Sequence, residues 1–285
     1  DPFHGPNREG LGEQLCAAVA SDVDHFAAGL ADLETAEPTY ARAVVRGFIH
    51  AVASGQPIPW PPVLSYCDWI LRQGVSEPVA PGHVWGRDPG WTWAWGAVSD
   101  LVEAGLKEGA ARVPVGERRQ LWAVLDALLR TPAPQAEGRQ EPFDLVEIAI
   151  NNTRGRAFER MLDYAFWVRE QTGIDPEEGF SQMPEVRDVL DRHLDSSIEP
   201  SLAMRAMYGL VLPRLFALDR RWLAGAKGQI FPTDSGRRAE RDAAWSAYLR
   251  YCRLFDDIFA SLEEVYRTEV DARSRNASGV QGIGH

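Results

Sequence analysis

The sequence predicts an all-α protein. Apolar residues recur at three- and four-residue spacing along most of the chain, which places them on one face of a helix. No segment shows convincing period-two alternation, and neither Asn-Gly nor Asp-Gly marks a hairpin turn. These observations favour stacked helical pairs in an irregular HEAT-like or TPR-like array, an α-solenoid, with a compact helical bundle as the alternative.

Four apolar runs show this spacing clearly. The first extends from Tyr40 to Val52, the second from Leu121 to Leu129, and the third from Met161 to Phe166. The longest extends from Trp245 to Tyr266 and predicts a single helix face of about six turns.

Segments rich in proline and glycine separate the predicted helices. GQPIPWPP (55–62) ends one helix and lets Pro61 or Pro62 open the next, which runs to about Arg72. VPVGER (113–118) begins another helix. Further interruptions are predicted at 76–90, 131–142, 174–185 and 229–238. The resulting domain organisation comprises acidic N-terminal helices (1–37), an α-helical repeat domain (38–270) and a flexible Gly/Ser-rich tail (271–285).

The composition is that of a globular protein with a substantial core. The chain has 285 residues, of which 45% are hydrophobic and 25% charged, too apolar for a disordered chain. Three widely spaced cysteines form neither a disulfide set nor a zinc motif and suit a reducing compartment. No signal peptide or membrane-spanning run is recognisable, so a cytoplasmic protein without a membrane partner is expected.

Charge is unevenly distributed along the chain. The net charge of −11 argues against a general nucleic-acid binder. Residues 1–40 carry eight acids and one base, whereas residues 205–241 carry eight bases and three acids. The two segments are either ordinary solvated faces or surfaces that steer partners. Nucleic-acid binding is the alternative function, through Arg214, Arg220, Arg221, Arg237 and Arg238.

Catalytic and cofactor motifs are missing from the sequence. It contains no P-loop GxxxxGK[ST], no HExxH, no GxSxG and no dinucleotide-binding GxGxxG, and its histidines lack metal-ligand spacing. We therefore predict a non-enzymatic protein without cofactor or metal. A less favoured alternative is a magnesium-dependent all-α enzyme that uses Asp256 and Asp257, although no second acidic cluster accompanies them.

Two stretches supply candidate binding residues. Trp91 and Trp95 share one helix face and could stack against a ligand, but packing between helices is the favoured interpretation. Arg154 could bind a phosphate; a structural junction is favoured there as well. In that junction Asn152 or Thr153 caps a helix that starts near Arg154, and Gly155 allows close approach of another backbone.

One segment also resembles a known family. AINNTRGRAFERMLDYAFWV (149–168) resembles an AIN-x-x-RG-x-A signature in the helical C-terminal regions of large bacterial STAND-like or other P-loop ATPases, many of them associated with antiphage defence. Segments 38–70, 89–106 and 201–249 resemble neighbouring parts of these regions in the same order, so the resemblance covers roughly residues 38–250.

The resemblance implies an α-helical array that lies C-terminal to an ATPase or effector domain. Such an array acts as a scaffold, an oligomerisation surface or a sensor of a viral protein. This chain lacks the ATPase and effector parts, which implies a fragment or a stand-alone relative. The expected partner is protein: the associated ATPase or effector domains or subunits, a viral protein, or a further copy in a homo-oligomer. No catalytic residue carries over from the family.

Overall fold

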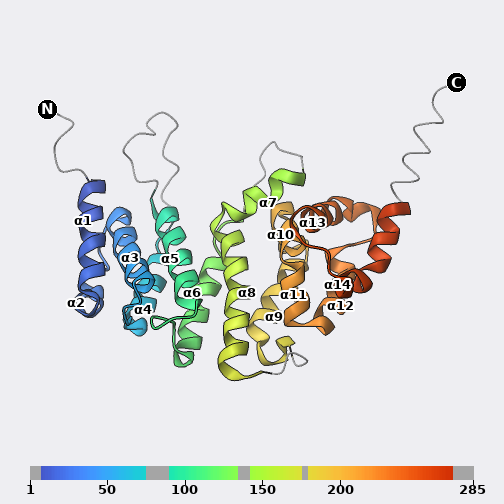
Figure 1. Cartoon of the computed structure of the whole chain (residues 1–285). Coiled ribbons are helices and arrows are strands. Elements are labelled where there is room, and N and C mark those ends of the chain that lie inside the picture. Colours follow the sequence, from blue (N-terminus) through green and yellow to red (C-terminus); the bar gives the residue numbers. More distant parts are fainter. Residues whose placement is uncertain (1–7, 75–89, 134–141, 175–178, 272–285) are drawn as a thin grey trace, which may run out of the picture. The chain divides into compact units, whose positions relative to one another are not determined.

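The computed structural model describes residues 8–74, 90–133, 142–174 and 179–271 (Figure 1). Within these ranges every regular element is a helix and none is a strand, which confirms the all-α prediction. No helix in them is long and apolar enough to cross a membrane. The predicted loop at 76–90 and the predicted tail lie almost entirely outside the described residues.

The chain divides into two compact units. Unit 1 contains the described parts of residues 1–134 and 148–174, and unit 2 contains those of 135–147 and 175–285. The helix α7 (Pro142–Ile150) spans the boundary in sequence. The repeat domain predicted at 38–270 therefore includes parts of both units, which we describe separately.

Unit 1 consists of helices arranged in two rows. Its elements are α1 (Arg8–Ser21), α2 (Val23–Ala28), η1 (Leu30–Leu33), α3 (Pro38–Ala53), α4 (Trp60–Leu71), α5 (Trp91–Leu106), η2 (Val115–Glu117), α6 (Arg118–Leu129) and α8 (Thr153–Thr172). Helices α1, α3, α5 and α8 pack side by side in one row, and α4 and α6 pack in the other, where α6 also contacts α8 (Figure 1). Alternate helices are thus neighbours, which is consistent with a helical-repeat array.

Helix starts in unit 1 agree with the predicted punctuation. Helix α4 has proline in its first turn and ends at Leu71, within one residue of the predicted end. The VPVGER segment forms η2 and leads directly into α6. Proline suits a first turn because its missing N–H has no intrahelical partner there.

The polar segment before α8 is a capped junction, as predicted. Asn152 is the N-cap, and its Oδ1 accepts a hydrogen bond from the backbone N–H of Arg154 at 2.9 Å. Gly155 is buried, and a Cβ there would collide with the backbone carbonyl of Ala149. Glycine at this position therefore lets the first turn of α8 lie directly against the end of α7.

Unit 2 is built around two tightly packed helices, α10 and α13. Its helices are α9 (Pro184–Leu194), α10 (Leu202–Leu210), α11 (Leu212–Leu218), α12 (Arg220–Ile230), α13 (Arg238–Tyr251) and α14 (Asp256–Ser261), followed by a helical segment at 263–271, with turns η3 (Gly179–Gln182) and η4 (Ser235–Arg237). A Cβ on Gly209 of α10 would collide with the carbonyl of Ala244 of α13, so the two backbones nearly touch. Beside this contact, the buried Arg205 pairs with Glu240 at 3.1 Å.

The single six-turn helix predicted over 245–266 is wrong. Helix α13 ends at Tyr251, Cys252 and Phe255 are extended, and α14 begins at Asp256. A continuous helix would separate Trp245 from Tyr266 by about 30 Å, yet their ring centroids lie 4.8 Å apart. The chain folds back because this aromatic contact buries Trp245 and half-buries Tyr266, and no proline or glycine marks the break.

The close approach of α10 and α13 predicts opposite effects for two glycine substitutions. Gly209→Ala should lower the free energy of unfolding by more than about 2 kcal/mol, because the methyl group meets backbone that cannot move alone. Gly225→Ala, in α12, adds a methyl group that meets nothing and should stabilise by up to about 1 kcal/mol. Urea unfolding measures both; equal effects would contradict the tight contact.

Candidate functional site

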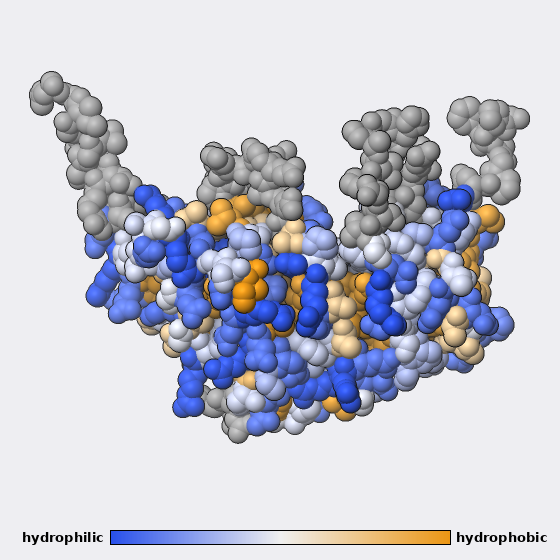
Figure 2. Space-filling view, turned by 180° about the vertical axis from the view of Figure 1, so that it is seen from behind, coloured by the Kyte–Doolittle hydropathy of each residue, from blue (hydrophilic) through white to orange (hydrophobic). Residues whose placement is uncertain are grey.

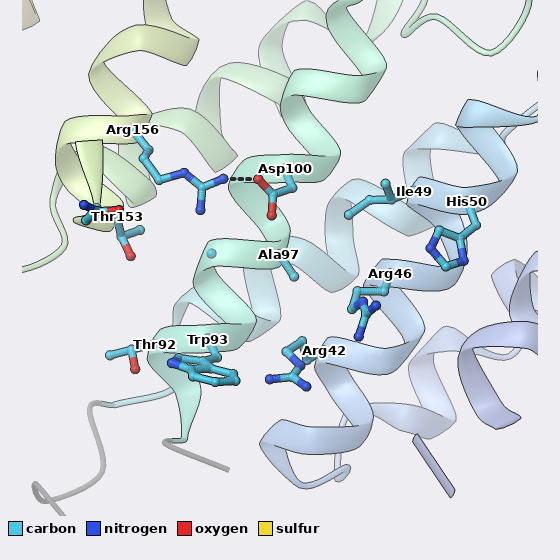
Figure 3. Close-up of a pocket in the computed structure, with 12 residues that line it drawn as sticks. Arg42, Arg46, Ile49, His50, Thr92, Trp93, Ala97, Asp100, Thr153 and Arg156 are labelled. Atoms are coloured by element: carbon cyan, nitrogen blue, oxygen red, sulfur yellow. Dashed lines mark hydrogen bonds and ion pairs between the residues drawn. The ribbon is translucent and has the colours of Figure 1, made fainter. Parts of the chain in front are cut away.

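A groove on unit 1 is the best-formed candidate site. It has a volume of about 590 Å³ and lies between α3, α5 and the start of α8 (Figure 3). We call it the arginine groove; it is lined by Arg42, Arg46, Ile49, His50, Thr92, Trp93, Gly96, Ala97, Asp100, Asn151, Thr153 and Arg156. All of these residues belong to unit 1.

The α3 wall follows from helical spacing. Arg42, Arg46 and His50 are four residues apart and therefore lie on one face of α3 (Figure 3). Val44 and Phe48 lie on the other side of the helix and are fully buried in the core. Burial of the apolar face thus fixes the orientation of the arginines toward the groove.

On the α5 wall an exposed tryptophan supports one of these arginines. Trp93 is 55% exposed, and the guanidinium carbon of Arg42 lies 4.9 Å from the centroid of its ring. This cation–π contact holds Arg42 in place, and because the ring attracts the charge without accepting a conventional hydrogen bond, the N–H donors of Arg42 stay available. Arg42 is thus pre-oriented for a ligand.

The start of α8 contributes a third arginine. Arg156 forms an ion pair with Asp100 of α5, and this pair links the start of α8 to α5 (Figure 3). Burial, and then repulsion from Arg160, lower the pKa of the Arg156 guanidinium. Gly96 lies beneath this guanidinium, because a Cβ there would be 3.6 Å from its Nη1. Arg156 is therefore anchored, whereas the arginines of α3 are free to meet a ligand.

The charges in the groove are out of balance. The lining contains three arginines and one aspartate. Within the described ranges Arg42 and Arg46 have no acidic partner. Most other arginines of unit 1 do, among them Arg8, Arg72, Arg112, Arg130 and Arg160. In a chain of net charge −11, the groove is a local excess of positive charge that suits an anionic ligand.

The titratable groups of the groove suit binding better than acid–base chemistry. Next to the groove, the Sγ of Cys16 lies 3.6 Å from Nδ1 of His50. A cysteine and a histidine at this distance could in principle act as a nucleophile and its base. Cys16 is only 6% exposed, and burial raises the pKa of its thiol. Asp100, the only carboxylate in the lining, is already paired with Arg156.

Arg154, a predicted binding residue, lies outside the groove lining and ties two helices together. Its Nε donates a hydrogen bond of 2.5 Å to the backbone carbonyl of Thr131, just beyond the end of α6. The bond fastens the start of α8 to the chain that leaves α6 and gives the Thr131 carbonyl a hydrogen-bond donor. This placement supports the junction interpretation.

Trp91 and Trp95 share one face of α5, as predicted, and that face packs on α4. Trp95 is 5% exposed and donates from Nε1 to the carbonyl of Ile70 at 3.1 Å. Trp91 makes an edge-to-face contact with Trp69 at 5.5 Å. Trp93, on the remaining face, is the tryptophan that lines the groove, and sequence reasoning did not select it.

The groove residues of α3 also escaped selection, although a signal for them exists. Arg42, Arg46 and His50 form a polar stripe at four-residue spacing, opposite the apolar stripe of the same helix. Such a stripe usually marks a solvated face. It indicates a binding site only when the structure shows that Trp93 and Arg156 line the same groove.

Acids neutralise most of the basic stretch at 205–241. Arg220 pairs with Asp257 at 3.5 Å. Arg237 pairs with Glu240 at 2.7 Å, and Arg238 pairs with Asp242 at 3.4 Å. These pairs leave little unneutralised charge for a phosphate backbone.

A second groove, on unit 2, brings two of the predicted arginines together. It has a volume of about 640 Å³, and its lining includes Arg187, Arg221, Arg237, Asp191 and Asp195. Two aspartates line this groove, against one in the arginine groove, and Arg187 and Arg237 are already paired with Asp191 and Glu240. This groove therefore favours an anion less than the arginine groove does.

The predicted magnesium alternative finds no further ligands in the described part of the chain. Asp256 and Asp257 are exposed in the first turn of α14, and Asp257 already pairs with Arg220. The described residues contain no group of three or more histidine, cysteine, aspartate or glutamate side chains that could hold a metal. Mg²⁺ generally needs several oxygen ligands or bound phosphates.

Comparisons with protein-family models, with curated proteins and with solved structures find no match for the chain. The resemblance to helical regions of defence ATPases therefore stays a prediction, and function is inferred from the groove itself.

The junction role of Arg154 predicts a loss of stability on truncation. Arg154→Ala should lower the free energy of unfolding by about 1–2 kcal/mol, because the Thr131 carbonyl loses a charge-assisted donor. This corresponds to a fall in Tm of about 2–6 °C by calorimetry. Arg119→Ala, which removes an exposed arginine of α6, is the matched control. An unchanged Tm for Arg154→Ala would contradict the junction role.

The buried cysteines predict slow alkylation of the native protein. Burial raises the pKa of Cys67 to about 12 and that of Cys252 to about 11, and it raises that of Cys16 as well. Thiolate is therefore scarce at neutral pH. Iodoacetamide should label Cys67 and Cys252 at least about 100-fold more slowly than a free cysteine, and Cys16 more slowly than a free cysteine as well. Peptide mass spectrometry measures the rates, with denatured protein as the control. Rapid native labelling of Cys16 would instead indicate an activated dyad with His50.

Proposed function

We propose that the chain is a non-enzymatic helical-repeat module that binds protein, and that the arginine groove holds an acidic segment of its partner. The observation that carries the proposal is the pair Arg42 and Arg46. Both line the groove with the exposed ring of Trp93, and neither has an acidic partner in the described chain. Unpaired arginines with an aromatic neighbour are typical of the energetically important part of a protein interface.

The mixed chemistry of the groove favours a peptide over a small organic ligand. Its volume of about 590 Å³ is within the usual range for ligand sites, but charged and hydroxyl side chains dominate the lining. Ile49 and Ala97 add an apolar part between the arginines and Asp100. An acidic segment with an apolar residue beside its carboxylates would match both parts.

Nucleic acid is the less suitable anion. A phosphate backbone needs a continuous basic track, whereas the basic excess of the groove is confined to one site in a chain of net charge −11. A short acidic segment needs only the local excess.

The cellular role within the proposal follows from the resemblance at 149–168. The module would be the scaffold or sensor part of a bacterial antiviral-defence ATPase, or an associated protein, in the cytosol. The partner would then be the ATPase or effector part, or a viral protein. The three free cysteines, two of them buried, suit a reducing cytosol.

Binding of a defined acidic probe tests the groove. Fluorescence anisotropy with a fluorescein-labelled octaglutamate peptide should detect binding that weakens with salt, and an octaglutamine peptide should not bind. Arg42→Glu and Arg46→Glu should each weaken octaglutamate binding about tenfold, because each replaces an attraction by a repulsion. Arg119→Glu makes the same charge change at an exposed site outside the groove and should change binding less than about twofold.

Two results would overturn this assignment. One is equal weakening by all three charge reversals, because the attraction would then come from the net charge and not from the groove. The other is tighter binding of a single-stranded oligonucleotide of equal charge, which would favour the nucleic-acid alternative.

A further inference from the structure

Large apolar side chains are exposed together where α13 passes into α14 in unit 2. They are Leu249, Tyr251, Leu254, Phe255 and Phe259, which we call the α13–α14 surface. Their exposed fractions range from 43% for Leu249 to 67% for Leu254. Most of the face in Figure 2 is hydrophilic, and apolar colour is confined to small patches, so five such residues within eleven positions are unusual.

The backbone at the centre of this surface is extended and available for pairing. Cys252 and Phe255 have extended dihedral angles, and the Cys252 thiol is anchored on the carbonyls of Gly209 and Leu210 at 3.4 and 3.2 Å. Within the described chain, the backbone N–H groups of Arg253, Leu254 and Phe255 donate no hydrogen bond. An anchored, extended segment with free donors can pair with another chain.

The charges that flank the two exposed apolar residues are self-complementary. The order is Arg253, Leu254, Phe255, Asp256, with a base at one end and an acid at the other. Arg253 and Asp256 are exposed and have no ion-pair partner among the described residues. If two copies of this segment run antiparallel, Arg253 of each copy faces Asp256 of the other. A two-fold contact needs a surface that complements itself in this way.

We propose that the α13–α14 surface is a contact between two copies of this chain, related by a two-fold axis near Leu254 and Phe255. The apolar side chains form the centre of the contact, and the two Arg253–Asp256 pairs close its edges. The inference concerns unit 2 alone and is independent of the function proposed for the arginine groove.

The size of the surface sets the expected strength of the contact. At about 200 Å² for each large side chain, the five residues expose about 500 Å² in all. Leu249 and Tyr251 point to different sides of α13, so one partner covers less than this, whereas a stable interface buries about 800 Å² per partner. The dimer is therefore expected to be weak and concentration-dependent. The expected dissociation constant is on the order of 10 μM.

Sedimentation velocity over a concentration series tests the contact. The full chain should shift with concentration from its mass of 31.7 kDa toward twice that value. Leu254→Glu should abolish the shift, because it places a charge at the centre of the contact. Ile198→Glu, at another exposed apolar residue of unit 2, should leave the shift unchanged, as should Arg42→Glu in the groove. Circular dichroism checks that each variant stays folded.

Mixing two charge variants distinguishes a two-fold contact from any other partner. Arg253→Asp alone and Asp256→Arg alone should each be monomeric, because each homodimer would oppose like charges at both edges. An equimolar mixture should dimerise, because the acidic segment of one variant then faces the basic segment of the other. A wild-type chain that stays monomeric at all concentrations, or a mixture of the variants that stays monomeric, would overturn the proposal.

Discussion

Close backbone approach at small residues is the constraint on which both units depend. The first turn of α8 can lie against the Ala149 carbonyl only because position 155 has no Cβ, and α10 meets the Ala244 carbonyl only because position 209 has none. Gly47 likewise lets α3 lie against Val19 of α1. Helix α3 packs against α1 on one side and α5 on the other, so only a narrow strip of its surface stays free of helix packing. On α3 that strip carries the arginines of the groove.

The charge balance around this strip explains why it could bind an anionic ligand. An acidic protein can neutralise its arginines internally, and in unit 2 even the buried Arg205 finds Glu240. In the described part of unit 1, Arg8, Arg72, Arg112, Arg130, Arg156 and Arg160 are all paired with acids. Arg42 and Arg46 lie on adjacent turns of α3 without an acidic partner among the described residues, and Trp93 holds Arg42 in position. These two arginines can attract an anionic ligand because no acidic side chain of the described chain neutralises them.

Local chemistry could be predicted from the sequence, whereas long-range packing could not. The cap at Asn152 was predictable because its side chain acts on a backbone group two residues away. Trp93 was not, because the neighbours of α5 decide which of its three tryptophans faces solvent. The break at Cys252 was hidden for the same reason: it depends on Tyr266 returning to Trp245, a contact between segments that local spacing does not reveal.

Weak attraction in the groove and weak self-association are compatible with a useful scaffold. An exposed ion pair contributes about 0–1 kcal/mol, so a short acidic segment bound by two free arginines dissociates readily. In the proposed dimer, two copies joined through unit 2 would present two grooves, and a partner with two acidic segments that reach both would bind more tightly than one acidic segment does. Selectivity would then depend on the arrangement of acidic segments in the partner more than on the affinity of one groove.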